Sequence, residues 1–183
     1  HWDREMADRL LALFRLPEKR RLQKLSKGML SMVTIIVALA SKADFTFLDE
    51  PVAGLDVVAR DQFYKLLLEE YSATGRTFLI STHIIEEAAD VLEEVIIIHD
   101  GRIKMVANTQ DLLDHARYVS GKAEDVDAAV AELEVHHGES VGRGKGVMVL
   151  LKDGEQLRDG VDVTVQPMSL QKVFVALCGE EER

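Results

Sequence analysis

The stretch FTFLDEPVAGLD, Phe45 to Asp56, decides how the sequence is interpreted. A short apolar run ends in two adjacent carboxylates, Asp49 and Glu50, and a turn containing proline and glycine leads to a third acid. Burying a charged group is costly unless the group is paired or bound to a metal. Taken alone, the Leu48-Asp49-Glu50 triplet favours the simpler explanation that both acids cap the following turn. Its meaning therefore depends on the sequence around it.

Helical and strand-like segments alternate on both sides of this stretch. Ser26 is placed to cap a helix with the apolar spacing i, i+3, i+4, i+7, and Asp56 is placed to cap the next one. We expect helices over residues 29–40, 57–71 and 85–92 and strands over 45–48, 77–81 and 95–99. Apolar strands separated by helices predict an α/β fold with a parallel sheet covered on both faces. Ligands bind such sheets at the carboxyl ends of the strands, where Asp49, Glu50 and His83 would lie.

The pattern changes after about residue 117, where short strands and turns replace the regular alternation. The Asp100-Gly101 pair before it predicts a tight turn between two strands. We expect a small α+β appendage with strands over 118–120, 147–151 and 161–165 and helices over 126–133 and 170–177.

Composition excludes several classes of protein. Hydrophobic residues make up 47% of the chain and charged residues 30%, which is typical of a globular protein. The single cysteine, Cys178, rules out an internal disulfide. The most apolar stretch, Met29 to Ala40, is far shorter than the roughly 20 residues of a membrane-spanning helix. The net charge of −10 argues against a nucleic-acid partner, and the basic run RLPEKRRLQKLSK is either a solvated face or an anion-facing docking surface.

Four segments resemble, in order and near the expected spacing, the motifs of ABC-type ATPases. LSKGM (25–29) resembles the signature motif, and FTFLDE (45–50) resembles the Walker B strand with its catalytic glutamate. PVAGLD (51–56) resembles the D-loop, and STH (81–83) resembles the switch-histidine loop. The resemblance covers residues 1–107. It implies a partial P-loop NTPase core of the RecA-like type, preceded by a remnant of the helical subdomain.

The resemblance also implies roles for individual residues. Asp49 matches the ligand that holds Mg²⁺ through water, and Glu50 matches the residue that polarises the hydrolytic water. His83 matches the histidine that contacts the γ-phosphate of ATP. The family's nucleotide-binding positions in the signature and the D-loop fall on Leu25, Ser26, Lys27, Gly28, Gly54, Leu55 and Asp56.

Two substitutions depart from the usual signature. Lys27 stands where the family has glycine and adds a positive charge near a phosphate, whereas Met29 replaces a glutamine and removes a possible hydrogen bond. Ser26 and Gly28 are therefore the firmest positions of the motif. Both precede a helix whose free N–H groups and dipole favour an anion.

ATP binding in this family also needs a phosphate loop, G-x-x-x-x-G-K-[ST], and the 183 residues contain none. The nearest candidate, Gly138 to Gly146, has glycine where serine or threonine should bind the metal, and a strand is expected after it. We interpret it as a flexible hairpin turn. The chain therefore resembles the C-terminal half of an ATPase subunit, inactive by itself.

These observations predict three parts. Residues 1–42 would be the remnant of the helical signature subdomain, 43–116 the C-terminal half of the ATPase core, and 117–183 an accessory domain. The predicted function is ATP hydrolysis by an export-type transporter subunit on the cytoplasmic face of the cell membrane. Its partners would be a separate membrane subunit and a second ATPase subunit arranged head to tail. The alternatives are a soluble ABC ATPase acting on DNA or ribosomes, and a C-terminal module with a regulatory or dimerisation role.

Overall fold

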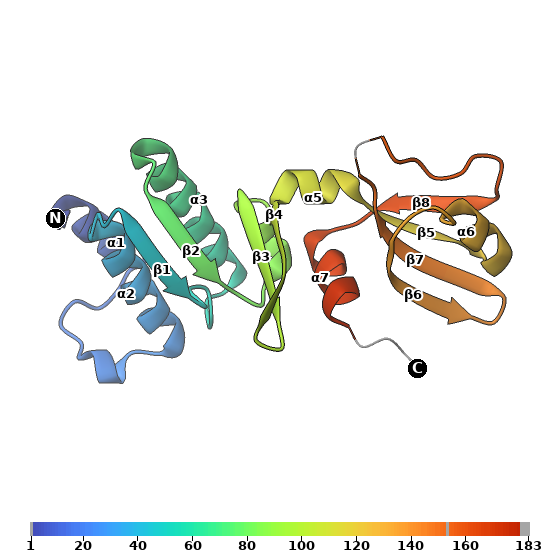
Figure 1. Cartoon of the computed structure of the whole chain (residues 1–183). Helices are drawn as coiled ribbons and strands as arrows, with labels where there is room; N and C mark the ends of the chain where they lie inside the picture. Colours follow the sequence, from blue (N-terminus) through green and yellow to red (C-terminus); the bar gives the residue numbers. More distant parts are fainter. Residues whose placement is uncertain (1, 153, 180–183) are drawn as a thin grey trace. The chain divides into compact units, whose positions relative to one another are not determined.

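The computed structural model describes residues 2–152 and 154–179, which fall into two compact units, His1–Ile84 and Ile85–Arg183 (Figure 1). Neither of the expected boundaries, at 42/43 and 116/117, coincides with this division. The three-part organisation inferred from the sequence stays a prediction.

The first unit combines helices with a small parallel sheet. Its elements are α1 (Arg4–Leu13), the 3₁₀ turn η1 (Leu22–Lys24), α2 (Lys27–Ala40), β1 (Phe45–Asp49), α3 (Val57–Thr74) and β2 (Thr77–Ser81). The strands β1 and β2 pair in parallel, with Phe45 opposite Thr77 and Asp49 opposite Ser81. This register brings the carboxyl ends of both strands to the same end of the sheet (Figure 1).

The helix ends confirm the expected caps. The Ser26 hydroxyl accepts a hydrogen bond from the Met29 amide at the start of α2, and the Asp56 carboxylate accepts one from the Ala59 amide at the start of α3. Gly75 ends α3 in the left-handed conformation, with φ of 65°. Each cap satisfies backbone groups that have no partner within the helix.

The expected sheet is wrong on two points, the covering of its faces and the strands that belong to it. Thr46 and Leu48 of β1 are buried, but the alternate residues Phe45 and Phe47 are 52% and 72% exposed. Only one face of the two-stranded sheet is therefore covered in its unit. The expected strand over 95–99 does not join this sheet, because it lies in the second unit and pairs antiparallel with the next strand.

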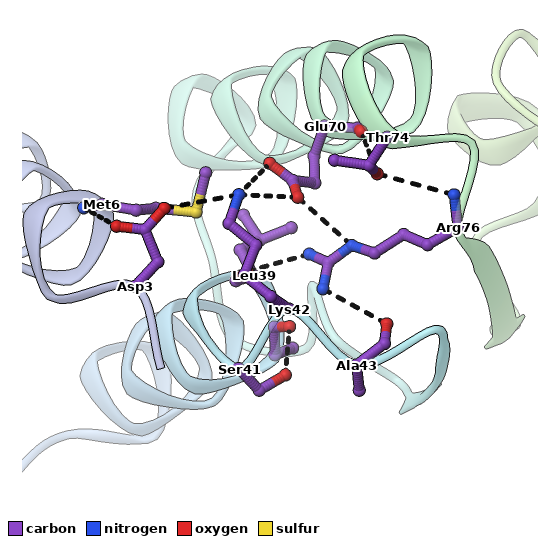
Figure 2. A network of polar contacts seen from close by, with 10 residues as sticks. Asp3, Met6, Leu39, Ser41, Lys42, Ala43, Glu70, Thr74 and Arg76 are labelled. Carbon is purple, nitrogen blue, oxygen red and sulfur yellow. Dashed lines mark hydrogen bonds and ion pairs between the residues drawn. The ribbon is translucent and has the colours of Figure 1, made fainter. Parts of the chain in front are cut away.

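A buried network of charges joins the helices of the first unit (Figure 2). The Lys42 ammonium lies 2.8 Å from both carboxylate oxygens of Glu70, and Arg76 Nε lies 3.3 Å from one of them. Arg76 also donates to the Leu39 carbonyl at 2.9 Å, and Asp3 Oδ2 lies 3.5 Å from the Lys42 ammonium. The network therefore connects residues beside α1, α2 and β2 through one side chain of α3.

The second unit begins with a helix and a hairpin and ends in an antiparallel sheet. Its elements are α4 (Ile85–Ala89), β3 (Glu94–His99), β4 (Arg102–Asn108), α5 (Thr109–His115), β5 (Ala116–Lys122), α6 (Ala123–Ala129), β6 (Val135–Val141), β7 (Gly144–Leu150), β8 (Val163–Pro167) and α7 (Leu170–Cys178). The larger sheet has the order β6-β7-β5-β8. Asp100 and Gly101 connect β3 to β4 with φ of 50° and 69°, the conformation of a tight hairpin turn.

The segment from Gly138 to Gly146 is the hairpin between β6 and β7, as expected, and no helix follows it. Gly146 has a structural reason of its own. A Cβ atom at this position would lie 1.9 Å from the Tyr118 hydroxyl, which passes over the glycine and donates to Glu139. Glycine therefore leaves room for the Tyr118 ring at the position where a phosphate loop would carry serine or threonine.

No helix in the described ranges is long and apolar enough to cross a membrane.

Candidate functional site

The carboxyl ends of β1 and β2 form the centre of the candidate site. Because Asp49 lies opposite Ser81 in the parallel register, the Ser81 hydroxyl donates to Asp49 Oδ1. The Asp49 side chain stays exposed to solvent. Ser81 belongs to the expected histidine-loop motif, but its contact with Asp49 was not predicted. A small hydroxyl at the end of the neighbouring strand was the available signal.

Glu50 follows in an unusual backbone conformation. Its φ of 45° lies in the left-handed region, which costs a residue with a side chain on the order of 1–3 kcal/mol. The Glu50 amide donates to the Ser81 carbonyl at 2.9 Å, which anchors this turn to the end of β2. Such strain persists only where the surroundings impose it, and it is common at functional sites.

The Glu50 carboxylate meets the loop that follows β2. Its Oε1 accepts from the His83 amide at 3.0 Å and lies 2.7 Å from Nδ1 of the same histidine. The other oxygen, Oε2, is buried and has no hydrogen-bond partner among the described residues. A buried acceptor without a donor is costly. His83 therefore fixes Oε1 and leaves Oε2 as the unpaired acceptor of the Glu50 carboxylate in the described part of the chain.

The signature residues lie at the start of α2. Ser26 and Lys27 are exposed, and Leu25 is half-buried. Gly28 packs against the turn after β1, because a Cβ atom on Gly28 would lie 2.5 Å from the Gly54 carbonyl oxygen. The signature and the D-loop are thus in direct contact within one chain.

The D-loop residues differ in what they offer a ligand. Gly54 is exposed, with φ of 79°. Leu55 is only 7% exposed, so its side chain belongs to the core and its backbone alone is available. Asp56 is exposed but caps α3 through the Ala59 amide at 2.8 Å. The structure therefore gives two clusters. The first contains Asp49, Glu50, Ser81 and His83. The second is the signature packed against the D-loop, and the D-loop follows Glu50 directly and so connects the two.

The comparisons with known proteins show which proteins the chain is similar to. The family described as "AAA domain, putative AbiEii toxin, Type IV TA system" matches residues 15–89. The ABC transporter ATP-binding protein YtrB of Bacillus subtilis is 23% identical over 100% of this chain and 64% of its own length. The taurine import ATP-binding protein TauB of Shigella dysenteriae is 37% identical over 58% of this chain and 41% of its own. The chain is a homologue of ABC transporter ATP-binding domains.

A solved structure is also similar to this chain. The structure of an ATP-binding subunit of an ABC transporter matches with a TM-score of 0.51 and 30% identity, over 61% of this chain and 48% of that one. The fold is therefore a mixed α/β, ABC-cassette-like fold with small sheets. The chain spans less than two thirds of the length of each of these relatives.

The side-chain oxygens of Asp49 and Ser81 are chemically suited to a magnesium ion. The described residues contain no cluster of three or more His, Cys, Asp or Glu side chains that could enclose a metal ion. Mg²⁺ is usually held by one or two carboxylates together with waters and phosphate oxygens. Asp49 is exposed and has the Ser81 hydroxyl beside it, which is a hard-oxygen donor set. The residues present therefore fit an ion shared with a bound phosphate.

Proposed function

We propose that the chain is part of the ATP-hydrolysing subunit of an ABC transporter, which energises transport by a separate membrane subunit. The observation that carries this proposal is the contact between Glu50 and His83 beside Asp49, at the carboxyl end of the parallel β1–β2 pair. Homology to ABC transporter ATP-binding proteins supports it.

The residues of the site divide the work of hydrolysis. Glu50 would orient the attacking water and accept its proton, a contribution of typically 10²–10⁴ in rate. His83 holds the Glu50 carboxylate in position. It would also contact the transferred phosphate. Asp49 would hold Mg²⁺ through water, and that ion would neutralise charge on the phosphates. None of these roles requires a change in the fold of the first unit.

The start of α2 completes the site in a dimer. Ser26, Lys27 and the free amides of α2 would contact the γ-phosphate held by a second ATPase subunit arranged head to tail. Leu25 and Gly28 shape the helix start, and the D-loop residues Gly54, Leu55 and Asp56 would lie at the same interface. The assembly would lie at the cytoplasmic face of the cell membrane, against a membrane subunit of the export type.

The phosphate loop would come from polypeptide outside the 183 residues. Residues 117–183, which contain nearly all of the β6-β7-β5-β8 sheet, would serve as an accessory module for regulation or dimerisation. The chain by itself should therefore neither bind ATP tightly nor hydrolyse it.

Hydrolysis assays test this proposal. In the complete polypeptide that contains these residues, Glu50→Gln should lower the magnesium-dependent rate by about 10²–10⁴. Glu69→Gln, which alters an exposed acid of α3, is the matched control and should keep the rate. Equal hydrolysis rates for Glu50→Gln and the parent protein would refute the role assigned to Glu50. Hydrolysis by the 183 residues alone that Glu50→Gln abolishes would refute the claim that the chain is inactive by itself.

A further inference from the structure

The Ser31 side chain attaches the turn after Glu50 to helix α2. The Ala53 amide donates to the Glu50 carbonyl at 3.0 Å, and the Leu55 amide donates to the Val52 carbonyl at 3.1 Å. The Ser31 hydroxyl, on the second turn of α2, donates to the Ala53 carbonyl at 2.7 Å. The peptide groups around Ala53 thus connect Ser31 on one side to the backbone of Glu50 on the other.

A steric contact reinforces this link. A Cβ atom on Gly28 would lie 2.5 Å from the Gly54 carbonyl oxygen, closer than side-chain carbons approach in real structures. A Cβ atom on Gly54 would in turn lie 3.3 Å from the Gly28 amide nitrogen. The helix start and the turn therefore touch backbone to backbone. Neither can move toward the other without displacing it.

We propose that Ser31 is a positioning residue that makes the start of α2 and the Glu50 turn move as one body. The inference rests on the proposed function for its meaning, because the start of α2 carries the signature and Glu50 carries the water. Ser31 lies far enough along the helix to contact the turn while Ser26 and Lys27 remain exposed. Its hydroxyl touches none of the proposed reacting atoms.

The consequence is a mechanical one. A phosphate that draws the start of α2 toward itself would pull Ala53 through the Ser31 hydrogen bond and push Gly54 through Gly28. Both changes act on the turn that holds Glu50 at φ of 45°. The alignment of the carboxylate would therefore respond to an anion that the carboxylate itself does not contact.

The test uses amide hydrogen exchange of the purified 183-residue chain, followed residue by residue by NMR without nucleotide. A hydrogen bond contributes about 0.5–1.5 kcal/mol, so Ser31→Ala should speed exchange of the Ala53 and Leu55 amides by roughly 2- to 13-fold. The His83 amide, which donates to Glu50, should change in the same direction. Ser31→Thr keeps the hydroxyl and should restore protection.

Thr34→Ala is the matched control, because its hydroxyl donates to the Leu30 carbonyl at 3.1 Å within the same helix and not to the turn. It should leave the Ala53, Leu55 and His83 amides unchanged. Gly28→Ala, which forces the helix start and the turn apart, should speed exchange at the same amides as Ser31→Ala.

Three results would overturn the inference: no change at these amides in Ser31→Ala, an equal change in Thr34→Ala, or a uniform change that also includes the β1–β2 amides. The last would show a merely structural role for the hydroxyl. Because no nucleotide is present, the outcome is independent of whether Glu50 supports ATP hydrolysis. The proposed function and this inference can therefore fail separately.

Discussion

Replacing Glu70 by glutamine should lower the free energy of unfolding of the first unit by far more than the small change in side-chain shape suggests. Glutamine keeps the size of the side chain but removes the carboxylate that faces both Lys42 and Arg76. The Glu70 and Arg76 side chains are each 4% exposed, whereas that of Lys42 is 26% exposed. Water can therefore solvate part of the lysine charge but little of the arginine charge.

The magnitude follows from this burial. Removing one partner of a buried ion pair costs about 3–5 kcal/mol, because it leaves an uncompensated charge. Arg76 keeps its hydrogen bonds to the Leu39 and Ala43 carbonyls, which favours the lower end, about 3 kcal/mol. That is a large part of the roughly 5–15 kcal/mol by which natural domains are stable.

Urea unfolding followed by the fluorescence of Trp2 measures the effect on the correct unit, because Trp2 is the only tryptophan of the chain. Lys65→Met is the control. This substitution breaks the ion pair between Lys65 and Asp61, whose side chains are 69% and 59% exposed, respectively. It should lower the free energy of unfolding by less than about 0.5 kcal/mol. If Glu70→Gln cost no more than Lys65→Met, the argument that the buried network stabilises this unit would be refuted.

The remaining predictions concern single contacts. The hydrogen bond to Glu139 raises the pKa of Tyr118 from 10.0 to about 12, so its stabilising contribution is complete below pH 10 and is lost as the pH rises toward 12. Absorbance of the tyrosinate form should show Tyr118 titrating late, and Glu139→Gln should bring its pKa back toward the ordinary value of 10.0. Gly146→Ala should destabilise the second unit by about 1–3 kcal/mol in thermal unfolding, whereas Gly138→Ala, whose new Cβ would meet its nearest atom at 3.6 Å, should change little.

Local features of the fold could be predicted from the sequence because they depend on neighbouring residues. Ser26 and Asp56 cap the helices that follow them, and Gly75 ends α3 in the left-handed conformation. The hairpin at Asp100-Gly101 has the two positive φ angles that this residue pair favours. Such features are decided within one turn of chain, so the pattern of residue types is sufficient.

Features that depend on distant pairing could not be predicted. The apolar strands β1 and β3 look alike in the sequence, yet one pairs in parallel with β2 and the other antiparallel with β4. The strand β6 was missed because its central residues, His136 to Ser140, lack the apolar alternation of a half-buried strand. Pairing with β7 decides its conformation, and the local pattern does not.

The candidate site shows the same limit. The motifs predicted that Glu50 and His83 belong together, and the structure places their side chains in contact. The left-handed conformation of Glu50 and the attachment of its turn to Ser31 could not be predicted, because both depend on residues from another element. What each site residue does chemically stays a prediction.

The uncovered face of the β1–β2 sheet has a practical consequence for handling the purified chain. The rings of Phe45 and Phe47 lie 5.0 Å apart on that face, and Leu79 on β2 is 42% exposed. Both strands also have an outer edge without a strand partner among the described residues. Exposed aromatic surface next to an unpaired strand edge promotes self-association, and sulfate or phosphate salts strengthen this hydrophobic association. Preparations should therefore aggregate with rising concentration and lyotropic salt, and a charged substitution such as Phe47→Lys should keep them dispersed.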